Sequence, residues 1–183
     1  MSNELNGLKI AILVSNGFEQ SEMTEPKQAL EKAGAEVLIV SPEEGNVKGW
    51  KHTDWGDKFK VDVELKKANP EKFDALVLPG GVMNPDTLRN TKEAISFIKS
   101  FVDNEKPIAA ICHGPWPLIN ADAVQGKTLT SWSSLKQDLL NAGANWVDKE
   151  VVKDGKLVTS RNPDDLPAFN REMINLFSES QSQ

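Results

Sequence analysis

The stretch Ile108-Ala109-Ala110-Ile111-Cys112-His113-Gly114-Pro115 predicts both the fold class and the place of a reactive group. Its first four residues are apolar, which is typical of a strand buried on both faces of a parallel sheet. Pro115 suits the first turn of a helix, so the chain is expected to turn sharply from strand to helix at Cys112. Such a corner exposes a side chain and places it at the positive end of a helix, which favours a thiolate.

The rest of the chain repeats this alternation of strand and helix. Residues 8–14, 37–40 and 75–78 are predicted strands, and residues 151–158 are a predicted hairpin with Asp-Gly as its turn. Helices are expected from Thr24 to Gly34, over 94–102 and 118–124, over 135–142 with Ser134 and Gln137 as a capping box, and from Pro167 to about Phe177. A small hairpin or irregular excursion is expected within 41–62. This order implies one α/β domain over 1–183, with its core at about 8–177 and a mostly parallel sheet covered on both faces.

Composition excludes several functional classes. The 27 acidic residues against 21 Lys and Arg give a formal charge of −6, which argues against binding of nucleic acid or of an anionic membrane. A single cysteine fits a reducing compartment, and Met1 to Ser15 lacks the pattern of a signal peptide, so a cytoplasmic location is expected. One Cys and two distant His do not make a zinc site, and dinucleotide and P-loop motifs are absent. We therefore expect neither a metal nor a cofactor.

Residues that could take part in catalysis follow three of the predicted strands: Glu19 after the first, Gly80-Gly81 after the third, and Cys112 after the fourth. Four segments around them, 16–22, 73–81, 110–115 and 159–169, together resemble the PfpI branch of the ThiJ/PfpI superfamily. The resemblance runs from about Lys9 to Phe177. It implies a flavodoxin-like three-layer sandwich, and homodimers or hexamers built from dimers.

The resemblance also implies roles for particular residues. Cys112 falls on the family nucleophile and His113 on the histidine beside it. Glu19 falls on the strand-one acid whose carboxyl approaches the thiol. Asp86 falls on the acid that orients the histidine from a neighbouring subunit, and it is one methylene shorter than the glutamate of the protease-like members. Trp116 stands where relatives often have glutamine, and its bulk is expected to narrow the substrate pocket.

The residues themselves leave some of these roles open. The amides of Gly80 and Gly81, together with that of His113, can face an oxyanion, but the glycine pair also suits an ordinary turn. Cys112 could be a small buried hydrophobe, and His113 could only cap the helix or meet a partner subunit. Asp86 could be a plain turn residue.

Three functions are compatible with this pattern. The leading hypothesis, implied by the resemblance, is a cysteine-dependent stress-response enzyme of the glyoxalase III or deglycase type, whose partner is a small carbonyl substrate or a glycated protein. Cys112 would attack the carbonyl carbon, and His113 or Glu19 would move a proton between adjacent carbons. The second is an intracellular cysteine peptidase that uses Cys112, His113 and Asp86 of a second subunit. The third is a non-enzymatic redox-sensing stress protein in which Cys112 is oxidised beside Glu19.

Overall fold

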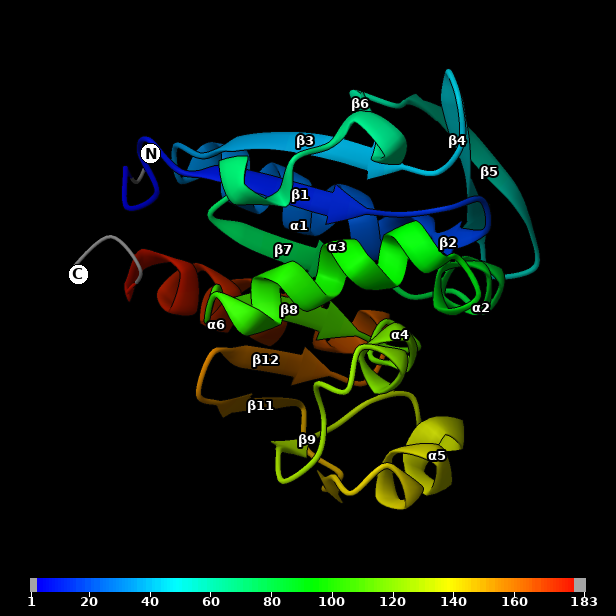
Figure 1. Cartoon of the computed structure of the whole chain (residues 1–183), viewed down its shortest axis with the longest axis vertical. Coiled ribbons are helices and arrows are strands. Elements are labelled where there is room, and N and C mark those ends of the chain that lie inside the picture. Colours follow the sequence, from blue (N-terminus) through cyan, green and yellow to red (C-terminus); the bar gives the residue numbers. More distant parts are fainter. Residues whose placement is uncertain (1–2, 180–183) are drawn as a thin grey trace.

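A seven-stranded sheet lies at the centre of the computed structural model, which describes residues 3–179 (Figure 1). In spatial order its strands are β11 (Val151–Asp154), β12 (Leu157–Ser160), β8 (Ile108–Ile111), β7 (Ala75–Leu78), β1 (Lys9–Leu13), β3 (Glu36–Ser41) and β6 (Val63–Glu64). All neighbours are parallel except β11 and β12, which form the predicted antiparallel hairpin. Without the two-residue β6, the parallel strands follow the order 2-1-3-4-5 of flavodoxin-like sheets, as the sequence predicts.

Helices cover both faces of this sheet and complete the predicted three-layer sandwich (Figure 1). One face is covered by α1 (Gln20–Lys32) and α6 (Leu166–Glu179); the other by α2 (Met83–Arg89), α3 (Lys92–Asp103), α4 (Trp116–Asn120) and α5 (Lys136–Asn141). Strand β1 serves both layers, because its successive side chains point to opposite faces. Ile10 and Ile12 join the core under α1 and α6, whereas Ala11 and Leu13 join the core under α2 to α5.

Smaller elements lie around the central sheet. The excursion expected within 41–62 is a hairpin of β4 (Asn46–Lys51) and β5 (Asp54–Lys60), and β4 pairs with β2 (Phe18–Glu19). The remaining elements are β9 (Thr128–Leu129), β10 (Asn145–Trp146), and the 3-10 helices η1 (Leu65–Lys67), η2 (Pro70–Lys72), η3 (Ser133–Leu135) and η4 (Pro163–Asp165). Within residues 3–179, the helices are too short or too polar to cross a bilayer.

Two helix starts differ from the prediction. Helix α1 begins at Gln20 and not near Thr24, whose hydroxyl donates to the Gln20 carbonyl inside the helix instead of capping it. The predicted capping box at Ser134 is also wrong, because α5 begins at Lys136 without a side-chain cap. The Ser134 hydroxyl lies instead 3.5 Å from Nε2 of His113. The first difference places Glu22 inside α1, and the second places Ser134 beside His113.

Candidate active site

Cys112 stands at the predicted corner, directly after β8 and four residues before α4 begins. Its φ of 64° is left-handed, a conformation that costs a residue with a side chain about 1–2 kcal/mol. Hydrogen bonds on both sides hold this conformation: the Cys112 amide donates to Ser160, and its carbonyl accepts from the Trp132 amide. The backbone around the thiol is therefore fixed by neighbouring strands and loops and not by the thiol itself.

The carboxyl beside the thiol belongs to Glu22, so the prediction that the Glu19 carboxyl approaches Cys112 is wrong. Glu22 lies fully buried in the first turn of α1, where its carboxyl interacts with the Cys112 side chain and Oε1 accepts the Gly80 amide at 3.0 Å. A Cβ at position 80 would stand 2.4 Å from that oxygen and 2.7 Å from the Cys112 Cβ. Glycine at this position is what allows the acid and the thiol to meet.

Burial dominates the electrostatics of this pair. It raises the pKa of Glu22 well above the ordinary value, and the nearby charge of Glu19 raises it further. Burial also raises the pKa of Cys112, with a further contribution from Glu22, while the amides of His113 and Gly81 oppose this rise. The helix start was expected to favour a thiolate, and burial opposes that effect by raising the pKa of the thiol. Since each ionised group disfavours the other, the pair holds at most one negative charge near neutral pH.

His113 meets the thiol because the chain bends at Cys112 itself. Its Nδ1 lies 3.4 Å from Sγ of Cys112, and its ring lies between Trp116 at 5.8 Å and the nearly parallel Trp132 at 5.9 Å. Burial lowers the pKa of His113, which favours the neutral imidazole. With Ser134 near Nε2, both ring nitrogens have a neighbour, so this histidine can exchange a proton with the sulfur but has no free nitrogen to offer a substrate.

Two backbone amides point at the sulfur, those of Gly81 and His113. The Gly80 amide does not join them, because it is bound to Glu22. Gly81 has a φ of 77°, and a Cβ there would lie 2.3 Å from the Gly17 carbonyl oxygen. Two of the three amides named from the sequence for an oxyanion site thus face the sulfur, and their role in binding an oxyanion stays a prediction.

The thiol opens into a cavity of about 430 Å³ at the carboxyl ends of the strands. It is lined by Gly17, Glu19, Glu22, Trp50, His52, Gly81, Val82, Met83, Cys112, His113, Trp132 and Pro163. The expected narrowing by Trp116 is not found, since Trp116 is not among the lining residues: its indole donates to Asp138 and lies under the Arg89 guanidinium. Trp132 takes that place at the cavity wall.

Asp86 does not reach this cavity within the chain. It lies exposed on α2 and lines a separate surface depression with Thr87, Arg89 and Asn120. The expected contact with His113 of another subunit stays a prediction.

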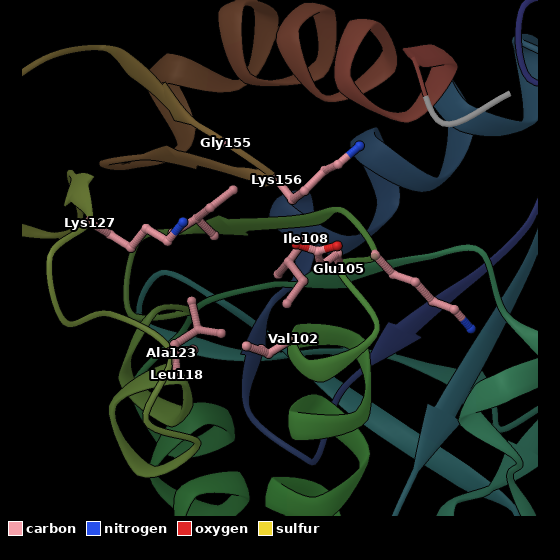
Figure 2. A pocket seen from close by; sticks show the side chains of 10 residues that line it. Val102, Glu105, Ile108, Leu118, Ala123, Lys127, Gly155 and Lys156 are labelled. Carbon is pink, nitrogen blue, oxygen red and sulfur yellow. The ribbon is translucent and has the colours of Figure 1, made fainter. Parts of the chain in front are cut away.

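Figure 2 shows a further cavity, of about 290 Å³, near the opposite end of the sheet. Ile108 and Leu157, the first residues of β8 and β12, line it together with Lys127 and Lys156. Its lining contains neither cysteine nor histidine. The groups that could carry out nucleophilic chemistry are gathered in the cavity at Cys112.

Comparison with known proteins agrees with this fold. Residues 8–176 match the model of the DJ-1/PfpI family. YraA of Bacillus subtilis, named as a candidate cysteine protease, is 48% identical to this chain. The match covers 92% of this chain and 97% of YraA. General stress protein 18 of Bacillus subtilis is 46% identical (93% and 98% covered), and protein/nucleic acid deglycase 2 of Escherichia coli is 46% identical (92% and 96% covered).

Solved structures show the same relationship. DJ-1beta of Drosophila melanogaster superposes with a TM-score of 0.83 at 28% identity, covering 100% of this chain and 97% of its own. A two-domain protein of Anabaena variabilis, with DJ-1/ThiJ/PfpI-like and ferritin-like domains, superposes with a TM-score of 0.86 at 35% identity. The match covers 92% of this chain and 47% of that longer chain. The fold, the cysteine corner and these relatives together show that the chain belongs to the DJ-1/PfpI family.

Proposed function

We propose that the protein is a cysteine-dependent enzyme that acts on small reactive carbonyl compounds or on their adducts with amines and thiols. The observation that carries this proposal is the convergence of the Cys112 sulfur, the buried Glu22 carboxyl and the amides of Gly81 and His113 at one cavity. The name of the relative in Escherichia coli, a protein/nucleic acid deglycase, supports the same substrate class.

The geometry supplies each part of an addition to an aldehyde. The thiol proton moves to Nδ1 of His113, the Glu22 carboxyl keeps its own proton, and Sγ forms a bond to the carbonyl carbon. The carbonyl oxygen becomes an oxyanion that the amides of Gly81 and His113 can bind. With methylglyoxal, a proton then moves from the attacked carbon to its neighbour, which converts the adduct to a thioester. Water cleaves the thioester to lactate, and no external oxidant or reductant is consumed.

Turnover of methylglyoxal by the purified protein tests this proposal. Cys112→Ala and the nearly isosteric Cys112→Ser remove the thiolate, so lactate formation is expected to fall by at least about 100-fold in both. Lys51→Gln, on the exposed face of β4, is a matched control that keeps full activity. Lactate formation by the wild type that is no faster than that by Cys112→Ala would refute the proposal.

A peptidase function is the second candidate, favoured by the name of the relative YraA and by the 3.4 Å contact between His113 and the sulfur. It needs an acid for His113, for which a second subunit would have to supply Asp86. Cleavage of unfolded casein that is lost in Asp86→Asn, while methylglyoxal is left untouched by the wild type, would favour the peptidase.

Redox sensing is a third candidate, because the Glu22 carboxyl beside the sulfur can hydrogen-bond to a sulfinate, and one relative is named a general stress protein. Mild peroxide would then add about 32 Da to the intact protein. This mass increase would be absent in Cys112→Ala. It would persist in the wild type, and the wild type would show no turnover of carbonyl compounds.

A further inference from the structure

His52 lies at the turn between β4 and β5 and lines the cavity of Cys112. Its backbone has an unusual conformation. Its φ of 56° is left-handed, where glycine or asparagine is more stable than histidine. The Trp50 indole donates to the His52 carbonyl at 2.8 Å and helps to fix this turn. A residue kept in a strained conformation by its surroundings is often a functional residue, so the side chain of His52 needs an explanation.

Glu19 provides that explanation, because both of its carboxylate oxygens are directed at His52. Oε2 accepts the His52 amide at 3.3 Å, and Oε1 lies 3.3 Å from Nδ1 of the ring. Glu19 is only 13% exposed, whereas the ring of His52 is 75% exposed. A carboxylate at Nδ1 fixes the tautomer that carries its proton there, and this leaves Nε2 as a free acceptor. Within residues 3–179, Nε2 has no hydrogen-bond partner.

The other acid–base groups of the cavity are already engaged. His113 is buried between aromatic rings with a neighbour at each ring nitrogen, and the fully buried Glu22 carboxyl has Oε1 on the Gly80 amide and a raised pKa that favours its protonated form. These groups can exchange the thiol proton. A proton that moves between two carbons of the substrate needs a base with a free lone pair that opens to the cavity, and His52 is the imidazole that meets this condition.

We propose that His52, oriented by Glu19, is the base that moves the proton between adjacent carbons of the Cys112 adduct. This inference rests on the proposed function. Nε2 takes the proton from the carbon bonded to sulfur, and the electron pair left behind forms the double bond of an enediolate as the neighbouring carbonyl becomes an alkoxide. The first oxygen, which takes the thiol proton back from Nδ1 of His113 after the addition, passes that proton to the second oxygen. Nε2 then returns its proton to the neighbouring carbon, and the first carbon becomes the thioester carbonyl.

Two variants that tolerate the left-handed turn test this role. His52→Asn and His52→Gly are expected to lower kcat for methylglyoxal by at least about 100-fold. The rate at which iodoacetamide alkylates Cys112 should stay within about twofold of the wild type, because the sulfur and its partners are unchanged. Added imidazole should restore turnover to His52→Gly, since the removed ring leaves an opening at the surface. Lys51→Gln, on the same hairpin and near Asp57, is the control that keeps full activity.

Glu19→Gln tests the orienting carboxylate and is expected to lower kcat by about tenfold. The inference is overturned if His52→Asn stays within threefold of the wild type while Cys112→Ala is inactive, a result that leaves the proposed function intact. It is also overturned if His52→Gly loses both turnover and alkylation and imidazole restores neither, which would show a structural role. A wild type no faster than Cys112→Ala overturns the inference and the proposed function together.

Discussion

Glu22 links the chemistry of the cavity to the stability of the fold. Because burial raises its pKa, the folded protein keeps this proton at pH values where the unfolded chain, with an ordinary glutamate pKa near about 4.3, has released it. The folded state then binds more protons than the unfolded state. The free energy of unfolding therefore falls as pH rises from about 4.3 through the raised pKa of Glu22.

The variant Glu22→Gln removes this pH dependence. The amide can still accept from the Gly80 amide, but it no longer has a proton to lose. We expect its urea midpoint to exceed that of the wild type at pH 8, and the difference to vanish near pH 4. Glu25→Gln, on the exposed face of the same helix, is the control in which no such gap opens with pH. Equal midpoints for Glu22→Gln and the wild type across this range would contradict the prediction.

Gly114 is fixed by close packing and not by an unusual φ. A Cβ there would stand 2.2 Å from the Leu78 carbonyl oxygen and 2.8 Å from that of Ile111, both in neighbouring strands. We expect Gly114→Ala to lower the free energy of unfolding by about 3 kcal/mol or more. Gly126→Ala has a φ of 77° but open space around the new methyl group, so it should cost about 1 kcal/mol. Urea denaturation compares the two, and similar losses would refute the packing argument.

At the scale of elements, Lys106, which follows α3, forms hydrogen bonds to the segment before β7. Its ammonium group donates to the carbonyls of Pro70 at 3.2 Å, Glu71 at 3.3 Å and Phe73 at 2.8 Å. Lys106→Met keeps the aliphatic stem and removes these bonds, so we expect a loss of about 2 kcal/mol in the free energy of unfolding. Lys99→Met, which breaks only an exposed pair with Asp103, should cost less than about 0.5 kcal/mol. If Lys106→Met lowers the free energy of unfolding by no more than Lys99→Met, the three hydrogen bonds contribute little to stability.

The strands were the most predictable elements, because buried parallel strands are short apolar runs bounded by turns. Residues 75–78 and the strand end at Ile111 agree with the structure, and the Asp-Gly hairpin was also correct. Helix α2 was not predicted, since its seven residues include Pro85 and show no long apolar period. The two-residue strands β2 and β6 depend on pairing with distant segments, which a local pattern does not contain.

The site was predictable only where it depends on local chain geometry. Cys112 was identified by its corner, whereas the acid was assigned to Glu19 from the family resemblance, and the carboxyl beside the thiol is that of Glu22. A helix that begins at Gln20 places Glu22 in its buried first turn, and Glu19 remains in β2. His52 and Trp132 reach the cavity from a hairpin and a loop far away in sequence, so no pattern around Cys112 could have pointed to them.

At the scale of the whole molecule, the mouth of the cavity is an apolar surface that a second copy of the chain could cover. Val82 is 57% exposed, Met83 41% and Trp132 40%, although all three line the cavity. Asp86 lies three residues after Met83, on the same side of α2. A symmetric dimer formed through this side would bury the apolar residues and bring the Asp86 carboxylates to the interface.

We therefore expect the 20.2 kDa chain to sediment as a dimer or a larger even-numbered assembly at micromolar concentration. Met83→Glu places a charge within the apolar surface and should shift the protein toward monomer in sedimentation velocity. Asp86→Asn should leave the assembly intact, and it should lower turnover only if the carboxylate reaches His113 across the interface. A monomeric wild type with full activity would contradict both expectations. It would also show that His113 works with Ser134 and the aromatic rings of its own chain alone.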